Sequence, residues 1–183
     1  MFSLIIFSLV TMATMNSNYD ALNGGDNANA GWDVRADMQG GNGIPDFTAA
    51  LAANGVDTSG FTATGVTTNP NPYSSSIRLA GETDWKSWPV RGMDAGFLAS
   101  STLEFQARAD GYETDEQIVT ALQTTPNVAV IDAFAIPQGG FDDDADAFKL
   151  TGMTDDDETF APVTIELAAP DGSVHQVTII GVI

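Results

Sequence analysis

The chain has 183 residues, and its 25 acidic and six basic side chains give a formal net charge of −19. Its length suits one ordinary domain, or one domain plus a membrane segment, and its charge argues against nucleic acid and anionic lipid surfaces as partners of the soluble part. The chain contains no cysteine, which excludes disulfide scaffolds, iron–sulfur clusters, thiolate zinc sites and cysteine nucleophiles.

The chain opens on an apolar run, Met1 to Met15, that contains no charged residue, and no Lys or Arg precedes Arg35. It is shorter than the roughly 20 residues that cross a bilayer, and it lacks the basic start of a signal peptide and the polar face of a soluble core helix. We expect residues 1–19 to be the C-terminal part of a transmembrane helix in the lipid bilayer. Residues 20–31 would then be a polar connector to a soluble body outside the cell. A signal or pilin-like leader and a core helix are the alternatives.

The first half of the body alternates short strand and helix patterns. Residues 31–37, GWDVRAD, alternate apolar and acidic or basic side chains, as in a half-buried strand. Pro45 suits the first turn of a helix that has Phe47, Ala50, Leu51 and Asn54 at helical spacing and ends at Gly55. Extended segments are expected at residues 61–68, 75–81 and 84–93, the last broken by Pro89, and a short helix at residues 94–100.

The second half repeats this pattern. Thr114 and Gln117 form a capping box for a helix that buries Ile118, Val119, Ala121 and Leu122. Residues 127–134, NVAVIDAF, form an almost continuous apolar strand that suits the middle of a sheet. Two alternating strands then flank the turn Pro-Asp-Gly at residues 170–172 and predict a hairpin. The fold class is therefore α+β, a single domain with one mixed sheet.

Candidate catalytic residues are few. His175 is the single histidine, and we expect it on the solvated face of the last hairpin, where it is structural rather than catalytic. The hydroxyls within Leu98–Ser101 have no adjacent base, and Asp132 is expected to cap the turn after its strand. No phosphate-binding or nucleophile motif occurs, so we predict no catalytic residues, no cofactor and no enzymatic activity of the chain.

Two acidic clusters bear on metal binding. Asp142, Asp144 and Asp146 alternate as in a calcium loop, but Ala147 and Met153 occupy the positions where that loop needs Gly and Glu. The cluster at residues 154–160 has four acids in a row and no such spacing. We therefore expect solvated acidic loops and no metal site. The many Asp and few Lys also resemble the composition of proteins from salt-loving microbes, in which salt screens carboxylate repulsion.

Three stretches carry a resemblance to a known family. They are GWDVRAD after the apolar start, ASSTLEFQARADGYETDEQIVTALQTTPNVAVIDAF, and VTIELAAPDGSVHQVTIIGVI. Together they resemble the extracytoplasmic part of FtsX-like ABC transporter permeases of the MacB/LolC type, in a haloarchaeal version. Residues 32–183 would then be a MacB-like extracytoplasmic (periplasmic core) domain, C-terminally incomplete, in a protein of the cell membrane.

The resemblance also implies a role and partners. The permease would be non-catalytic, with ATP hydrolysed by a separate ABC ATPase subunit that contacts parts of the permease beyond this chain. It would work as a permease dimer and would transmit ATP-driven movement to export or extract a hydrophobic or lipid-linked substrate. The main alternative is a membrane-anchored or pilin-like surface protein of a halophile. A secreted hydrolase is the third, although the residues it needs are missing.

Overall fold

The computed structural model describes residues 32, 46–68, 75–137, 147–169 and 171–183. The chain divides into two compact units, Met1–Asn42 and Gly43–Ile183, and Trp32 is the one described residue of the first. The predicted membrane segment 1–19, the connector 20–31 and the rest of the predicted strand 31–37 lie outside the described residues. Within the described ranges, no helix is both long enough and apolar enough to span a bilayer.

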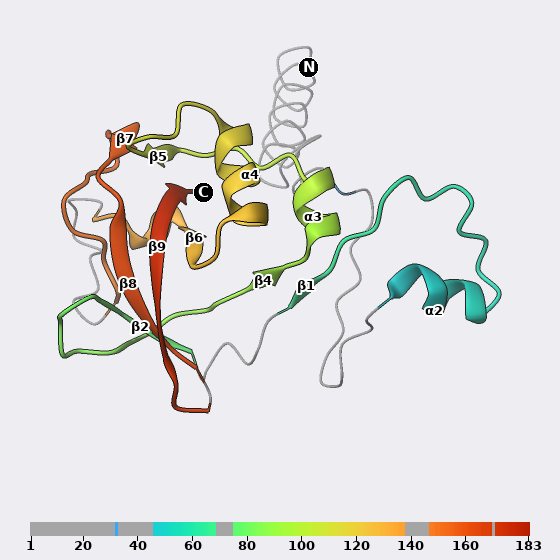
Figure 1. Cartoon of the computed structure of the whole chain (residues 1–183), viewed down its shortest axis with the longest axis horizontal. Coiled ribbons are helices and arrows are strands. Elements are labelled where there is room, and N and C mark those ends of the chain that lie inside the picture. The colour runs from blue at the N-terminus through green and yellow to red at the C-terminus, as the bar shows by residue number, and fades with distance from the viewer. Residues whose placement is uncertain (1–31, 33–45, 69–74, 138–146, 170) are drawn as a thin grey trace, which may run out of the picture. The chain divides into compact units, whose positions relative to one another are not determined.

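The second unit is built on a mixed sheet, which confirms the α+β class (Figure 1). Its strands follow the order β3-β2-β8-β9-β5-β7, with β6 also paired to β9. Their bounds are β2 (Ser76–Leu79), β3 (Lys86–Ser87), β5 (Ala107–Ala109), β6 (Val128–Ile131), β7 (Thr159–Phe160), β8 (Val163–Ala168) and β9 (Val174–Val182).

The nine-residue strand β9 organises this sheet. Thr178 and Ile179 pair with β8 on one edge and with β6 on the other, while Gly181 and Val182 pair with both β6 and β5. Strands β8 and β5 therefore follow one another along one edge of β9, and β6 occupies the opposite edge. The pairing with β6 is parallel, and the pairings with β8 and β5 are antiparallel.

The predicted hairpin of β8 and β9 is confirmed. Its turn is closed by hydrogen bonds from the Ala169 N–H to the Ser173 carbonyl and from the Gly172 N–H to the Ala169 carbonyl, both 2.9 Å. Gly172 has a φ of +84°, in the left-handed region that favours glycine. The Asp171 carboxylate accepts from the Ser173 backbone N–H at 2.9 Å. The turn residues thus set the register of the hairpin locally.

Each of the helices begins beside a side-chain cap, although the first begins at Phe47 and not at Pro45 as expected. They are α2 (Phe47–Ala53), α3 (Ala95–Ser100), α4 (Asp115–Thr124) and the 3₁₀ turn η2 (Ala133–Ala135). Asp46, Asp94, Thr114 and Asp132 each accept a hydrogen bond from a backbone N–H of the first turn. In the capping box, Gln117 Oε1 accepts from the N–H of Glu113, one residue before the cap, at 2.6 Å.

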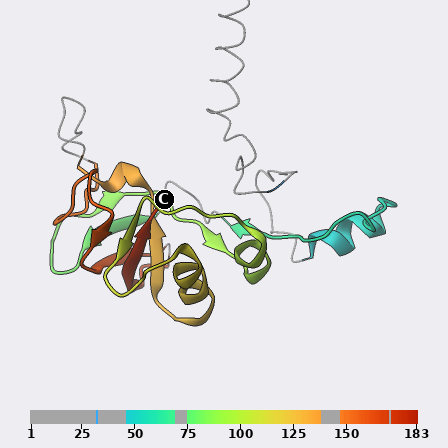
Figure 2. The same cartoon turned by 90° about the horizontal axis from the view of Figure 1, so that it is seen from above.

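The core lies where α4 meets the sheet. Ile118 is completely buried, and its Cδ1 atom would lie 3.1 Å from a Cβ added to Gly181 of β9. Phe105 would lie 2.9 Å from the same added atom, so the missing side chain of Gly181 is what lets the helix approach the sheet. Figure 2 shows α4 beside the curled sheet. As predicted, Ala121 is buried too, while Val119 and Leu122 are half-buried.

A small second sheet pairs β1 (Thr67–Thr68) with β4 (Gly92–Met93). The chain before β1 lies against the start of α3, where a Cβ on Gly65 would come within 2.5 Å of the Phe97 Cα. A Cβ on Gly96 would likewise collide with the Thr64 carbonyl oxygen. Two glycines therefore permit a backbone-to-backbone contact that positions α3.

Three strand predictions need correction. Within residues 61–68 only Thr67–Thr68 forms a strand, and residues 84–93 contribute two short strands, β3 and β4, to different sheets. The apolar strand β6 does not lie in the middle of the sheet, since among the described residues it pairs with β9 alone. Its apolar character arises because Val128, Ala129 and Val130 contact the core from the edge. Strands β5 and β7 were not predicted, although Ala107, Arg108 and Ala109 of β5 alternate apolar and charged side chains and are buried, half-buried and buried in turn.

Candidate functional site

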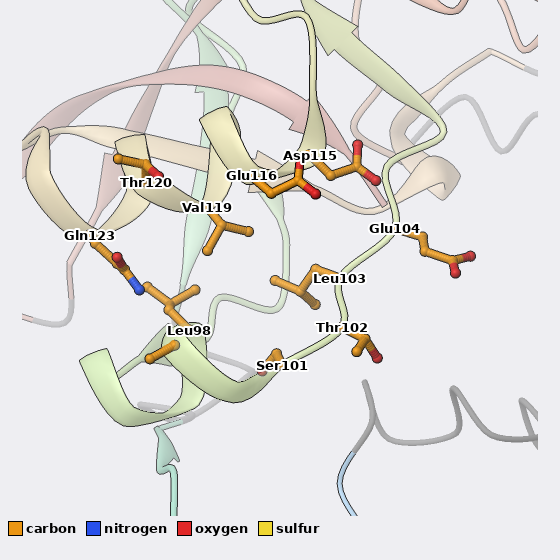
Figure 3. A pocket seen from close by; sticks show the side chains of 11 residues that line it. Leu98, Ser101, Thr102, Leu103, Glu104, Asp115, Glu116, Val119, Thr120 and Gln123 are labelled. Atoms are coloured by element: carbon orange, nitrogen blue, oxygen red, sulfur yellow. The ribbon is translucent and has the colours of Figure 1, made fainter. Parts of the chain in front are cut away.

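Among the described residues, the side chains able to bind a ligand or to react lie in two grooves and at the tip of the last hairpin. The first groove, of about 440 Å³, lies between α3 and α4 and is called the acidic groove here (Figure 3). Leu98, Leu103 and Val119 supply its apolar surface. Glu104, Asp115 and Glu116 are its charged lining residues, and no basic residue lines it.

Two of the carboxylates of this groove have polar contacts around the start of α4. Arg108 of β5 binds Asp115 through Nε at 2.7 Å and through a second guanidinium nitrogen at 2.6 Å. A hydrogen bond from its own backbone N–H, at the start of α4, lowers the pKa of Glu116, and the Thr114 hydroxyl and the Arg108 charge act in the same direction. The three carboxylates, beside hydroxyl and apolar side chains, give the acidic groove a negative surface that suits contacts with cations.

The second groove, of about 240 Å³, lies against the apolar face of the main sheet and is called the sheet groove here. Ile165 and Ile179 line it from β8 and β9, and β6 contributes its apolar residues. The segment Trp88–Arg91, between β3 and β4, lines it as well. Among the described residues, Arg91 is its one charged lining residue, and this side chain is exposed.

The hairpin tip brings an acid, a hydroxyl and the single histidine together. Ser173 Oγ donates to Asp171 Oδ1 at 2.6 Å and lies 2.8 Å from His175 Nε2. The Ser173 hydroxyl and backbone N–H both lower the pKa of Asp171. The order is wrong for a catalytic triad, in which the acid orients the histidine and the histidine takes the serine proton. Here the acid accepts from the serine itself, which is the geometry of a turn.

His175 is exposed, but the prediction that it lies on the solvated face of the hairpin is wrong. It pairs in register with Leu167, and Leu167 pairs with Ile77 of β2. Paired residues of antiparallel strands share a face, so His175 lies on the apolar face of the sheet, the same face as Val177. It is exposed because it lies near the turn, beyond the residues that cover this face.

The remaining candidates have structural roles where the structure describes them. Asp132 accepts from the Phe134 N–H at 2.9 Å and caps η2, as predicted. Ser101 ends α3 and donates its hydroxyl to the Phe97 carbonyl. Asp157 accepts two hydrogen bonds from Thr154 in its own loop. Asp142, Asp144 and Asp146 lie outside the described residues, and the described part of the chain holds no cluster of three potential metal ligands.

Sequence reasoning missed Arg91. The available signal is that a basic residue, rare in this chain, follows Trp88, Pro89 and Val90 in an apolar stretch. Whether such an arginine is paired depends on strands far away in the sequence, so the pattern alone cannot single it out. Comparisons of the chain with protein-family models, with curated proteins and with solved structures find no match.

Proposed function

We propose that this chain is the non-catalytic extracytoplasmic part of an FtsX-like, MacB/LolC-type ABC transporter permease, anchored in the cell membrane through residues 1–19. The sequence segments that resemble this family support the proposal, as does the α+β body with one main mixed sheet. The segment GYETDEQIVTALQTTPNVAVID contains α4 and then β6. The segment VTIELAAPDGSVHQVTIIGVI contains the hairpin of β8 and β9.

The observation that carries the proposal is that β9 is hydrogen-bonded to strands from both of these segments. Strand β9 is hydrogen-bonded along both edges, to β8 and β5 on one side and to β6 on the other. Beyond its last strand residue, the Ile183 N–H donates to the Ile131 carbonyl, and the Ile183 carbonyl accepts from the Ala133 N–H. A strand held on both edges resists bending, which suits a body that is displaced as a unit.

The mechanism follows from this stiffness. ATP binding and hydrolysis in a separate subunit tilt the membrane helices, and the extracytoplasmic body moves with them without changing its own fold. The displacement of two such bodies in a permease dimer opens or compresses a path for a hydrophobic or lipid-linked substrate. No residue of this chain takes part in a chemical step in this account.

The test uses distance measurements in the full-length protein within its membrane complex. Since the printed chain has no cysteine, Glu82→Cys and Gln123→Cys place two spin labels at exposed positions, in the turn after β2 and on α4. We expect an ABC ATPase to co-purify with the protein. The Glu82–Gln123 distance within one protomer should stay constant between nucleotide states, while the distance between the two Glu82 labels of a dimer changes.

Each other outcome counts against the proposal. A body whose internal label distance changes with nucleotide is not a rigid unit. Filaments without a bound ATPase would favour the pilin-like surface protein instead. A protein that extracts freely into buffer, without detergent and without a partner ATPase, would refute the permease assignment.

A further inference from the structure

The sheet groove combines an apolar lining with a single cationic group. Apart from Arg91, every described residue that lines it is apolar. Ile165 and Ile179 are buried, whereas Leu167, Val177 and Val130 are half-buried and leave apolar surface open to the groove. A ligand with an apolar part would remove this open apolar surface from water, and that burial favours binding.

The guanidinium of Arg91 differs from the other described arginines. Arg78 binds Glu166 at 2.5 Å and stacks over Trp85, and Arg108 binds Asp115. Arg91 has no ion pair and no side-chain hydrogen bond within the described part of the chain. In a chain with 25 acidic residues, an arginine left without a carboxylate partner is unexpected and is available for a ligand.

We propose that the sheet groove binds an amphiphile that carries one acyl chain and an anionic headgroup. The acyl chain lies along the sheet face between Trp88 and Val177, and the headgroup accepts hydrogen bonds from the Arg91 guanidinium. A volume of about 240 Å³ is below the ~300–1,000 Å³ of pockets for drug-sized ligands, so the groove suits one chain rather than a bulky ring system.

The net charge of −19 does not prevent this binding. At molar salt the Debye length is about 3 Å, so the field of distant carboxylates is screened while a direct contact with Arg91 persists. The acidic groove offers a contrast within the same body, since it carries carboxylates where the sheet groove carries a guanidinium. Anionic and cationic amphiphiles should therefore be distinguished by which groove they enter.

This inference rests on the proposed function for its biological meaning, because such a ligand belongs to the hydrophobic or lipid-linked substrate class. Binding itself is measured without ATP and without an ATPase subunit. Failure of the complex to assemble therefore leaves the binding result intact, and failure of binding leaves the permease assignment intact.

The experiment uses Trp88 as a reporter inside the groove. In the full chain, in lipid nanodiscs at molar KCl, Trp32→Phe and Trp85→Phe leave Trp88 as the single tryptophan. A fatty acid brominated at its chain end is titrated in, because bromine quenches tryptophan on contact. The brominated alcohol and trimethylammonium of equal chain length are the neutral and cationic comparisons.

We expect saturable quenching by the fatty acid and at least tenfold weaker quenching by the alcohol and the ammonium compound. Arg91→Glu should weaken fatty-acid binding by about tenfold or more, and Arg91→Lys should restore part of it. Arg108→Glu is the matched control, because it makes the same reversal of charge as Arg91→Glu but outside the sheet groove, and it should leave quenching unchanged. Each variant is first checked for native circular dichroism.

Three results would overturn the proposal. They are the absence of saturable quenching, equal binding of the three brominated compounds, and equal losses in the variants at Arg91 and Arg108. Quenching that persists in Arg91→Glu would show that the probe reaches Trp88 through the bilayer alone.

Discussion

The close contact between residues 64–65 and the start of α3 predicts that adding a methyl group at Gly65 destabilises the fold. Gly65→Ala and Gly60→Ala add the same methyl group five positions apart in the chain. At Gly65 the new Cβ meets the Phe97 backbone, at 2.5 Å from Cα and 2.6 Å from N. At Gly60 it meets nothing within 4 Å, and neither glycine has a positive φ. The two substitutions therefore differ in sterics alone.

The magnitude follows from the size of the overlap. Ordinary carbon contacts lie at about 3.5–4.0 Å, so the Gly65→Ala methyl overlaps the Phe97 backbone by about 1 Å. Backbone cannot rotate away as a side chain does, and overpacking of this kind costs about 1–3 kcal/mol. Gly60→Ala should instead leave stability unchanged or raise it by up to about 1 kcal/mol, because it restricts the unfolded chain.

Urea unfolding followed by tryptophan fluorescence measures the difference. A gap of about 2 kcal/mol between the two variants shifts the midpoint by about 1 M urea for a domain of this size. Hydrogen exchange of the Leu98 amide, which donates to the Asp94 carbonyl, reports whether α3 detaches locally. Equal midpoints and equal exchange for the two variants would show that residue 65 does not touch α3 in solution.

Four further outcomes are expected. Thr114→Ala should lower the unfolding free energy by about 0.5–2 kcal/mol, because the cap of α4 is lost. Thr120→Ala, at an exposed position in the middle of the helix, should not lower it. Equal effects of the two substitutions would show that the Thr114 side chain does not stabilise the helix as a cap. The hydrogen bond from Arg78 lowers the pKa of Glu166 below its ordinary 4.5, so its stabilisation is present above that pH and is lost as pH falls through the lowered pKa. Arg78→Gln should flatten the acid limb of a stability-versus-pH curve, and an unchanged limb would contradict this. The thermal midpoint should rise steeply from dilute buffer to molar KCl, and indifference to salt would count against a halophilic protein. Purified protein should hydrolyse neither ATP nor esters nor peptides, and turnover lost in His175→Ala or Asp132→Asn would refute a non-catalytic role.

Local chemistry explains the parts of the fold that could be predicted from the sequence. Thr114 with Gln117 marks the start of α4, and Pro-Asp-Gly at 170–172 marks the turn between β8 and β9. These signals involve residues within a few positions of each other, so their energies are nearly independent of the rest of the chain. The assignment of Asp132 to a cap succeeded for the same reason.

Periodicity proved a weaker guide for the sheet. The apolar run of β6 predicted a central strand, yet β6 lies at an edge and is covered on its face instead. The pattern reports that side chains are buried, but it does not report which neighbour buries them. The strands β5 and β7 have only three and two residues, so the alternation within β5 is too brief to mark a strand in the sequence.

The sequence by itself determined the start of α4, the turn between β8 and β9, the cap at Asp132, the acidic character of the chain and its apolar first residues. Only the tertiary structure decided which strands flank β9, that α3 lies against Gly65, and that Arg91 lies beside an apolar groove without a carboxylate partner among the described residues. The physical reason is the separation in sequence between the residues that interact. Caps and turns are settled by hydrogen bonds between near neighbours, whereas register, close approach and the pairing of a charge depend on residues brought together by the whole fold.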